Sequence, residues 1–231
     1  MNKQPSMNES TLLIMFHGFT GNHIEAGRLF SDLAINLCNA GITTIRFDYR
    51  GHGDSYGLFD EAFSIKNALE DSEYVVNYAI KMGFSKIGFL GFSLGGEMAL
   101  LTFKKFRNAI KALVLVAPVL SAEGPRSNWI LNQDRYRYSP FGPFRLRDKI
   151  IGEMKVNLMH IADEINVPIL IAHSKDDEVL DFRFSMEFYN QVKFTDKQIL
   201  LFDKGGHIFY DYEVRQRLYK EVTEWLIKRL K

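Results

Sequence analysis

The sequence predicts an α/β fold in which a mostly parallel sheet of about six strands is covered by helices on both faces. Short apolar runs alternate along the chain with longer segments whose apolar residues recur every three or four positions, as in buried strands and amphipathic helices. Such alternation favours parallel strands joined by crossover helices. The chain has 231 residues, 46% of them hydrophobic, which is enough for one core and predicts a single domain over residues 1–231.

The predicted strands are apolar runs bounded by glycine, proline or polar residues. They lie near residues 12–16, 43–48, 86–90, 112–117, 169–173 and 198–202. The helical segments lie between and after them, near residues 29–39, 65–81, 95–105, 184–192 and 213–231. In the last of these, Val214, Leu218, Val222, Trp225 and Leu226 repeat at helical spacing. The single cysteine, Cys38, excludes an internal disulfide, and the pattern of its segment predicts a buried position.

The segment Gly91-Phe92-Ser93-Leu94-Gly95 places a serine where a strand-like run ends and a helical run begins. A strand that turns directly into a helix forces the turning residue into strained backbone geometry, and neighbours without Cβ relieve the crowding. The serine hydroxyl then stands clear of the backbone. This layout is that of a nucleophile elbow, although the five-residue pattern alone also fits an ordinary turn serine.

Three further segments give this serine a chemical context. The run at 12–16 stops at His17-Gly18-Phe19-Thr20-Gly21, Asp176-Asp177 follows the run at 169–173, and Gly205-Gly206-His207 follows the run at 198–202. The carboxyl ends of parallel strands line one edge of a sheet, where ligands bind. Serine, acid and histidine therefore occur in that chain order along one predicted edge.

These residue types suit nucleophilic catalysis. A serine hydroxyl is a poor nucleophile unless an imidazole takes its proton, and the imidazole needs a carboxylate to hold its tautomer. We expect Ser93 as nucleophile, His207 as base and then acid, and Asp177 as the orienting acid. The backbone N–H groups of Phe19 and Leu94 are the expected oxyanion donors. His17, His52 and His173 are expected to have structural roles.

With these landmarks the chain resembles the serine esterases, lipases and peptidases of the α/β-hydrolase superfamily. The elbow, the segments 17–21 and 48–55, Asp177 and His207 match the family in order and spacing, from about residue 12 to the C-terminus. The stretches 19–22, 25–30 and 46–51 look most like those of small cinnamoyl or feruloyl esterases.

The chain departs from the family's pattern in two places. Ser174 stands where the strand before the acid commonly ends in glycine, which leaves Asp176 as an alternative to Asp177. The family's sheet usually has further strands before the first one here, but residues 2–10 are polar and predict no strand. The family's strand order then makes the 43–48 strand a sheet edge, and an exposed edge allows a homodimer.

Residues 119–166 break the alternation of strands and helices and are rich in aromatic residues and proline. In the family's fold an insertion at this place lies over the nucleophile, so we expect a small cap that excludes water and shapes the substrate pocket. Trp129, Gln133, Tyr136 and Tyr138 are the candidates for contact with an apolar or phenolic group. The alternative is that these residues form the cap's own core.

The predicted function is a serine hydrolase that cleaves carboxylic esters through an acyl-enzyme, with hydroxycinnamoyl (feruloyl) or short-chain aryl esters as substrates. The alternatives are a monoacylglycerol lipase or lysophospholipase, a thioesterase, and an aminopeptidase of the same fold. A ligand receptor that keeps the fold without catalysis is disfavoured by the complete set of serine, acid and histidine.

The composition and the motifs limit the kinds of ligand and partner that we expect this chain to bind. A formal net charge of +1 disfavours a general nucleic-acid binder. No apolar run approaches membrane-spanning length and the first residues lack a signal-peptide core, so we expect a cytoplasmic protein. No metal-ligand spacing appears, and Tyr56 stands where a dinucleotide fingerprint starting at Gly51 needs its third glycine. We therefore expect a small-molecule ester as ligand and no cofactor or metal.

Overall fold

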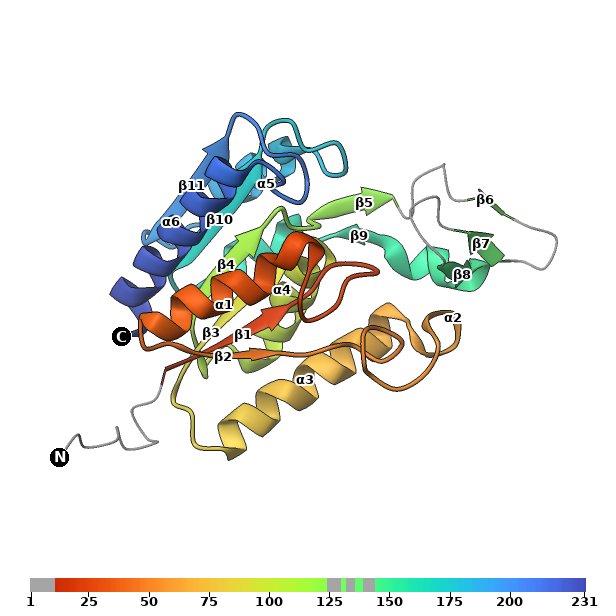
Figure 1. Ribbon diagram of the computed structural model, residues 1–231, viewed down its shortest axis with the longest axis horizontal. Coiled ribbons are helices and arrows are strands. Elements are labelled where there is room, and N and C mark those ends of the chain that lie inside the picture. Colours follow the sequence, from red (N-terminus) through yellow and green to blue (C-terminus); the bar gives the residue numbers. More distant parts are fainter. Residues whose placement is uncertain (1–10, 124–129, 132–135, 139–143) are drawn as a thin grey trace.

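The computed structural model describes residues 11–123, 130–131, 136–138 and 144–231, and in them a six-stranded sheet lies between two layers of helices (Figure 1). The strand order is β11-β10-β4-β3-β1-β2, and every pairing in it is parallel. The strands are β1 (Thr11–Phe16), β2 (Thr43–Arg46), β3 (Lys86–Phe92), β4 (Ile110–Val116), β10 (Ile169–Ser174) and β11 (Lys197–Phe202). The predicted fold class and strand number are confirmed.

The central strands are apolar on both faces because helices cover both faces. On β1, Leu12, Ile14 and Phe16 join one core cluster, and Leu13 and Met15 join the other. The first cluster holds buried residues of α3 (Ile65–Lys81), α4 (Leu94–Phe106) and α5 (Phe182–Gln191). The second holds buried residues of α1 (Leu29–Asn39) and α6 (Tyr212–Leu230). The two-residue period of the strand thus divides the core into two layers.

All five predicted helices are present, with ends within two residues of those expected. The short helix α2 (Phe59–Ala62) and the 3₁₀ turn η2 (Ala26–Arg28) were not predicted, since one turn shows no apolar period. The prediction for Cys38 was wrong, because it is exposed near the end of α1 while its neighbour Leu37 faces the core. Among the described residues, β2 pairs with β1 alone and forms one edge of the sheet, as predicted.

The insertion between β4 and β10 carries short elements of its own. They are β5 (Ser121–Glu123), β6 (Ile130–Leu131), β7 (Tyr136–Tyr138), β8 (Arg145–Arg147), η3 (Asp148–Met154), β9 (Lys155–Asn157) and η4 (Met159–Glu164). β5 pairs with β9, and β7 pairs with both β6 and β8, all antiparallel.

The insertion rests on the segment that contains α2, beyond one end of the main sheet (Figure 1). The Phe144 ring lies 5.1 Å from the Phe59 ring, and Arg145 Nε donates to Asp60 Oδ2 at 2.6 Å. That the insertion acts as a cap over the nucleophile stays a prediction. In the described part of the chain, none of the helices combines the length and the apolar content that crossing a bilayer requires.

Candidate active site

Ser93 lies at the turn between β3 and α4 in a backbone conformation that non-glycine residues seldom adopt, with φ 54° and ψ −120°. The strain is held by hydrogen bonds on both sides, since Ser93 N–H donates to the Val116 carbonyl and its own carbonyl accepts from Gly96 and Val119. Close packing explains the glycine at 95, because a Cβ there would lie 1.8 Å from the Phe16 carbonyl oxygen. This is the geometry of the predicted elbow.

His207 follows β11 and brings its ring to Ser93. Its Nε2 lies 3.0 Å from Ser93 Oγ, and the ring centroid lies 5.1 Å from that of Phe92. Both Ser93 and His207 are less than a tenth exposed. The His207 backbone N–H donates to Glu178 Oε2 at 3.1 Å, which ties the loop after β11 to the loop after β10.

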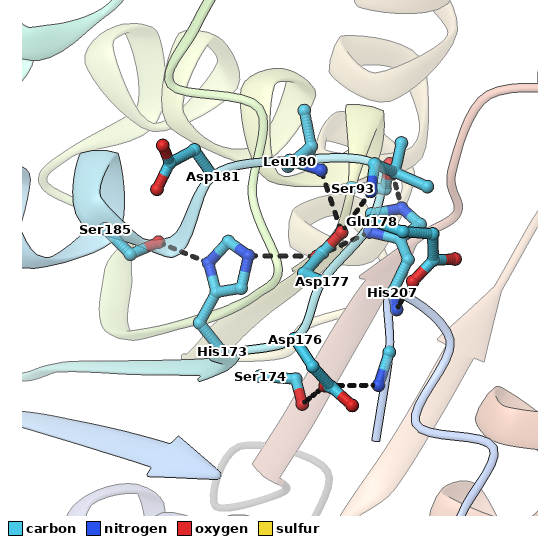
Figure 2. A network of polar contacts seen from close by, with 12 residues as sticks. Ser93, His173, Ser174, Asp176, Asp177, Glu178, Leu180, Asp181, Ser185 and His207 are labelled. Atoms are coloured by element: carbon cyan, nitrogen blue, oxygen red, sulfur yellow. Dashed lines mark hydrogen bonds and ion pairs between the residues drawn. The ribbon is translucent and has the colours of Figure 1, made fainter. Parts of the chain in front are cut away.

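Asp177 completes the arrangement from the loop after β10 (Figure 2). Its Oδ2 lies 2.8 Å from His207 Nδ1, and its Oδ1 accepts the N–H groups of Val179 and Leu180. Burial raises the pKa of Asp177, but hydrogen bonds from His173 and His207 outweigh burial and hold it well below its usual range. The ionised carboxylate accepts the Nδ1–H of His207, which leaves Nε2 free to accept the serine proton.

Asp176, the alternative acid, faces the other way. Its Oδ1 accepts from Ser174 Oγ at 2.7 Å and from the Gly206 N–H at 2.8 Å. Its Oδ2 accepts the Gly205 N–H at 3.2 Å. These bonds, led by that from Gly206, lower the pKa of Asp176. Asp176 therefore holds the backbone before His207, whereas Asp177 contacts the imidazole.

His173, expected to be structural, contacts the same carboxylate. Its Nε2 lies 3.0 Å from Asp177 Oδ2, and its Nδ1 lies 2.7 Å from Ser185 Oγ (Figure 2). His173 stands four residues before Asp177 where β10 ends, and this spacing is the one sequence signal for the contact. The signal is weak, because a histidine at the end of an apolar run more often packs in the core.

The loop after β1 passes directly beside the serine, because a Cβ on Gly18 would lie 3.2 Å from Ser93 Cβ. His17 Nδ1 donates to the Gly18 carbonyl at 2.8 Å, and its Nε2 accepts the Tyr49 N–H at 3.2 Å. Burial and, to a lesser extent, the neighbouring His52 lower the pKa of His17 to about 3. A neutral imidazole thus fixes the start of this loop, in the structural role expected.

Glu25 is a second residue that sequence reasoning missed. Its buried carboxylate accepts the Gly18 N–H at 2.5 Å and the Ala26 N–H at 3.1 Å. Burial raises the pKa of Glu25 despite these two bonds. This contact could not be predicted from the sequence, because Glu25 lies seven residues after Gly18 and meets it only when the loop folds back.

The two predicted oxyanion donors lie in the loop after β1 and at the start of α4. Phe19 lies in the loop next to Gly18, with its ring 5.5 Å from that of Phe63, and Leu94 is the first residue of α4. Their role as oxyanion donors stays a prediction. Trp129 and Gln133 lie outside the described residues, and Tyr138 is described only as part of β7.

Tyr136 is partly buried, with the Arg145 guanidinium 4.5 Å from its ring centroid. Its contact with a substrate stays a prediction.

One cluster in the described chain has side chains that suit a metal ion: His23, Asp48 and Asp54. The Asp48 oxygens already accept the His23 N–H at 2.5 Å, the His23 Nδ1–H at 2.8 Å and the Asp54 N–H at 3.0 Å. These bonds join the loops after β1 and β2. The Asp48 carboxylate is thus already engaged by hydrogen bonds, which fits a structural role.

Comparison with known proteins places the chain among hydrolases. A family model described as alpha/beta hydrolase fold matches residues 11–146, and one described as serine aminopeptidase S33 matches residues 133–213. A carboxylesterase of Bacillus subtilis is 22% identical over 94% of this chain and 92% of its own length. An uncharacterized abhydrolase domain-containing protein of Dictyostelium discoideum is 23% identical over 98% of this chain, which spans 27% of that protein's length.

Among solved structures, Est1E from Butyrivibrio proteoclasticus with bound ferulic acid is similar to this chain with a TM-score of 0.82. The identity is 23%, and the match covers 96% of this chain and 90% of that one. At this identity the likeness shows a shared fold.

Proposed function

This chain belongs to the α/β-hydrolase family, and on that premise we propose that it hydrolyses carboxylic esters through an acyl-enzyme intermediate. One observation carries the proposal. Ser93 Oγ, in an elbow conformation, lies 3.0 Å from His207 Nε2, and His207 Nδ1 lies 2.8 Å from Asp177 Oδ2. This geometry supports Ser93 as nucleophile, His207 as proton acceptor and donor, and Asp177 as orienting acid.

The reaction follows from the positions of these atoms. Ser93 Oγ attacks the ester carbonyl while His207 Nε2 takes its proton, and the imidazolium that forms is stabilised by Asp177. His207 then protonates the departing alcohol. A water molecule, deprotonated by the same imidazole, attacks the acyl carbonyl. The bond to Ser93 Oγ then breaks, His207 returns the proton to Oγ, and the acid is released. The N–H groups of Phe19 and Leu94 are proposed to hold the oxyanion in both steps.

For the substrate we propose an aryl or hydroxycinnamoyl ester. Support comes from the fold shared with a protein whose structure holds ferulic acid, and from the aromatic content of residues 119–166. The match to the serine aminopeptidase model over residues 133–213 supports a second candidate, an aminopeptidase. A screen that contains aryl esters of graded chain length, methyl ferulate and amino-acid nitroanilides separates the two.

The Ser93→Ala variant tests the proposed mechanism. The substitution removes one oxygen and opens almost no cavity, so the variant is expected to fold and to lose about three orders of magnitude or more in ester turnover. Covalent labelling by a fluorophosphonate probe is the second readout. Labelling of wild type but not of Ser93→Ala supports the proposal, whereas equal labelling of both refutes Ser93 as nucleophile.

A further inference from the structure

His173 and His207 share one oxygen of Asp177. His173 Nε2 lies 3.0 Å from Asp177 Oδ2, and His207 Nδ1 lies 2.8 Å from the same atom. The ring of His173 is 1% exposed and the Asp177 side chain is fully buried. Beyond His173 the chain of contacts continues to Ser185 Oγ at 2.7 Å, so polar contacts run from α5 to Ser93 (Figure 2).

The contact with Asp177 determines that one particular nitrogen of the His173 ring, Nε2, carries a proton. An ionised carboxylate only accepts hydrogen bonds, so the His173 Nε2 that faces it must carry a proton. At the other ring nitrogen, Nδ1 lies 2.7 Å from Ser185 Oγ, a hydroxyl that can donate to a neutral ring or accept from a charged one. Ser185 is itself fully buried in α5. The contact with Asp177 therefore places a proton on Nε2 of His173.

We infer that His173 is a positioning residue for the proposed reaction, and that it acts by holding Asp177 Oδ2 against His207. The inference rests on the proposed function. The Oδ1 atom is held by two backbone N–H groups, of Val179 and Leu180. His173 holds Oδ2 from within the buried side of the site, so contacts at both oxygens restrict the rotation of the carboxylate. His207 then receives its acceptor in one orientation.

Kinetics of two substitutions at this position test the inference. His173→Leu removes the donor, and we expect kcat for an aryl ester to fall about ten- to a hundredfold with KM within about twofold, since the ring does not face Ser93. His173→Gln carries an amide N–H near the position of Nε2 and should retain most of kcat. Equal losses in the two variants, or an unchanged kcat in His173→Leu, would overturn the inference.

Ile171→Ala is the matched control for packing. Ile171 lies two residues earlier on β10, is fully buried and belongs to the same core layer that α5 covers. Its truncation should lower the melting temperature and leave kcat unchanged where the protein remains folded. A kcat loss as large as that of His173→Leu would assign the effect to packing and defeat the proposed role.

Nuclear magnetic resonance of protein labelled with ¹⁵N-histidine gives a readout that needs no turnover. The inference requires a proton on Nε2 of His173. Ser185→Ala removes only the contact at Nδ1, so Nε2 should stay protonated and kcat should fall less than in His173→Leu. An unprotonated Nε2 in wild type would refute the inference, because the ring would then have no proton to donate to Asp177 Oδ2.

The two proposals fail in different ways. If wild type hydrolyses no substrate of the screen, the proposed function fails, and the protonation of His173 Nε2 still reports whether Asp177 is held as described. If wild type is active and that protonation or the kinetics disagree, the role of His173 fails alone.

Discussion

Asp176 and Asp177 show how two neighbouring carboxylates acquire different tasks from their surroundings. Asp177 is buried and contacts two imidazoles, whereas Asp176 accepts bonds from a serine hydroxyl and two glycine N–H groups. The chain turns between them, because the Asp177 N–H bonds back to the Ser174 carbonyl at 3.3 Å.

We predict that Asp177→Asn lowers ester turnover far more than Asp176→Asn. The amide at 177 cannot stabilise an imidazolium and favours the wrong tautomer of His207, which costs up to about four orders of magnitude in a serine triad. Asp176→Asn keeps one acceptor oxygen for the N–H groups of Gly205 and Gly206 and does not contact the imidazole, so it should lower stability more than turnover. Steady-state kinetics of both variants test this prediction. A larger loss of turnover in Asp176→Asn would identify Asp176 as the orienting acid.

Glu97, on the first turn of α4, is a buried acid outside the proposed chemistry. It is 2% exposed, and burial raises its pKa to about 8. The folded protein therefore holds a proton there that the unfolded chain releases at lower pH. Since the folded state binds more protons between the two pKa values, stability is full below the unfolded pKa and declines as pH rises towards 8.

The Glu97→Gln variant should remove this decline. Wild type is expected to lose up to about 1.4 kcal/mol of unfolding free energy per pH unit relative to the variant between pH 5 and 8. Urea unfolding of both proteins at several pH values measures the difference. Parallel pH profiles would show that Glu97 is ionised in the folded protein.

At the scale of elements, the loop after β1 is shaped by groups outside it. Gly18 donates its N–H to Glu25, and His17 accepts the N–H of Tyr49, which follows β2. A Cβ on Gly21 would lie 2.5 Å from Glu25 Oε1, so the loop wraps closely around this carboxylate. Glu25 thus holds the loop in the conformation that keeps Gly18 beside Ser93.

We predict that Glu25→Ala lowers kcat for an aryl ester about tenfold or more, because a buried acceptor for Gly18 is lost and the proposed oxyanion donor beside it moves. Glu25→Gln retains an acceptor oxygen and should keep more activity. The comparison of kcat at saturating substrate checks this. Equal activity of Glu25→Ala and wild type would show that the loop keeps its shape without the carboxylate.

The long helices and buried strands could be predicted from apolar spacing. Residue type at the strand ends predicted Ser93, Asp177 and His207, which lie in hydrogen-bond contact, and their catalytic roles stay predictions. His173 and Glu25 escaped because their partners are fixed by tertiary folding, and Cys38 was misplaced because its position borders the apolar stripe. The elements between β4 and β10 are too short for a period to appear.

At the scale of the whole molecule, β2 is the outermost strand on one side of the sheet that the described residues form. Its half-exposed strand offers backbone groups to a partner, although Arg46 turns inward to the His23 carbonyl and Ser31 Oγ. We predict a homodimer through this edge. Light scattering over a range of concentrations should show a mass that doubles, and Thr44→Pro, which places a strand breaker on the edge, should restore the monomer. A monomer at the highest concentration refutes it.

The hydroxyl of Thr11 on β1 donates to the carbonyl of Leu230 on α6, 219 positions later in the chain. The apolar face of β1 that carries Leu13 and Met15 is covered in part by this last helix. Ribosomes add about 5 to 20 residues per second, so the first strand waits on the order of 10 to 45 s for its final partner. During that time this apolar surface stays exposed on the nascent chain. We expect the supply of chaperones to limit the yield of folded protein.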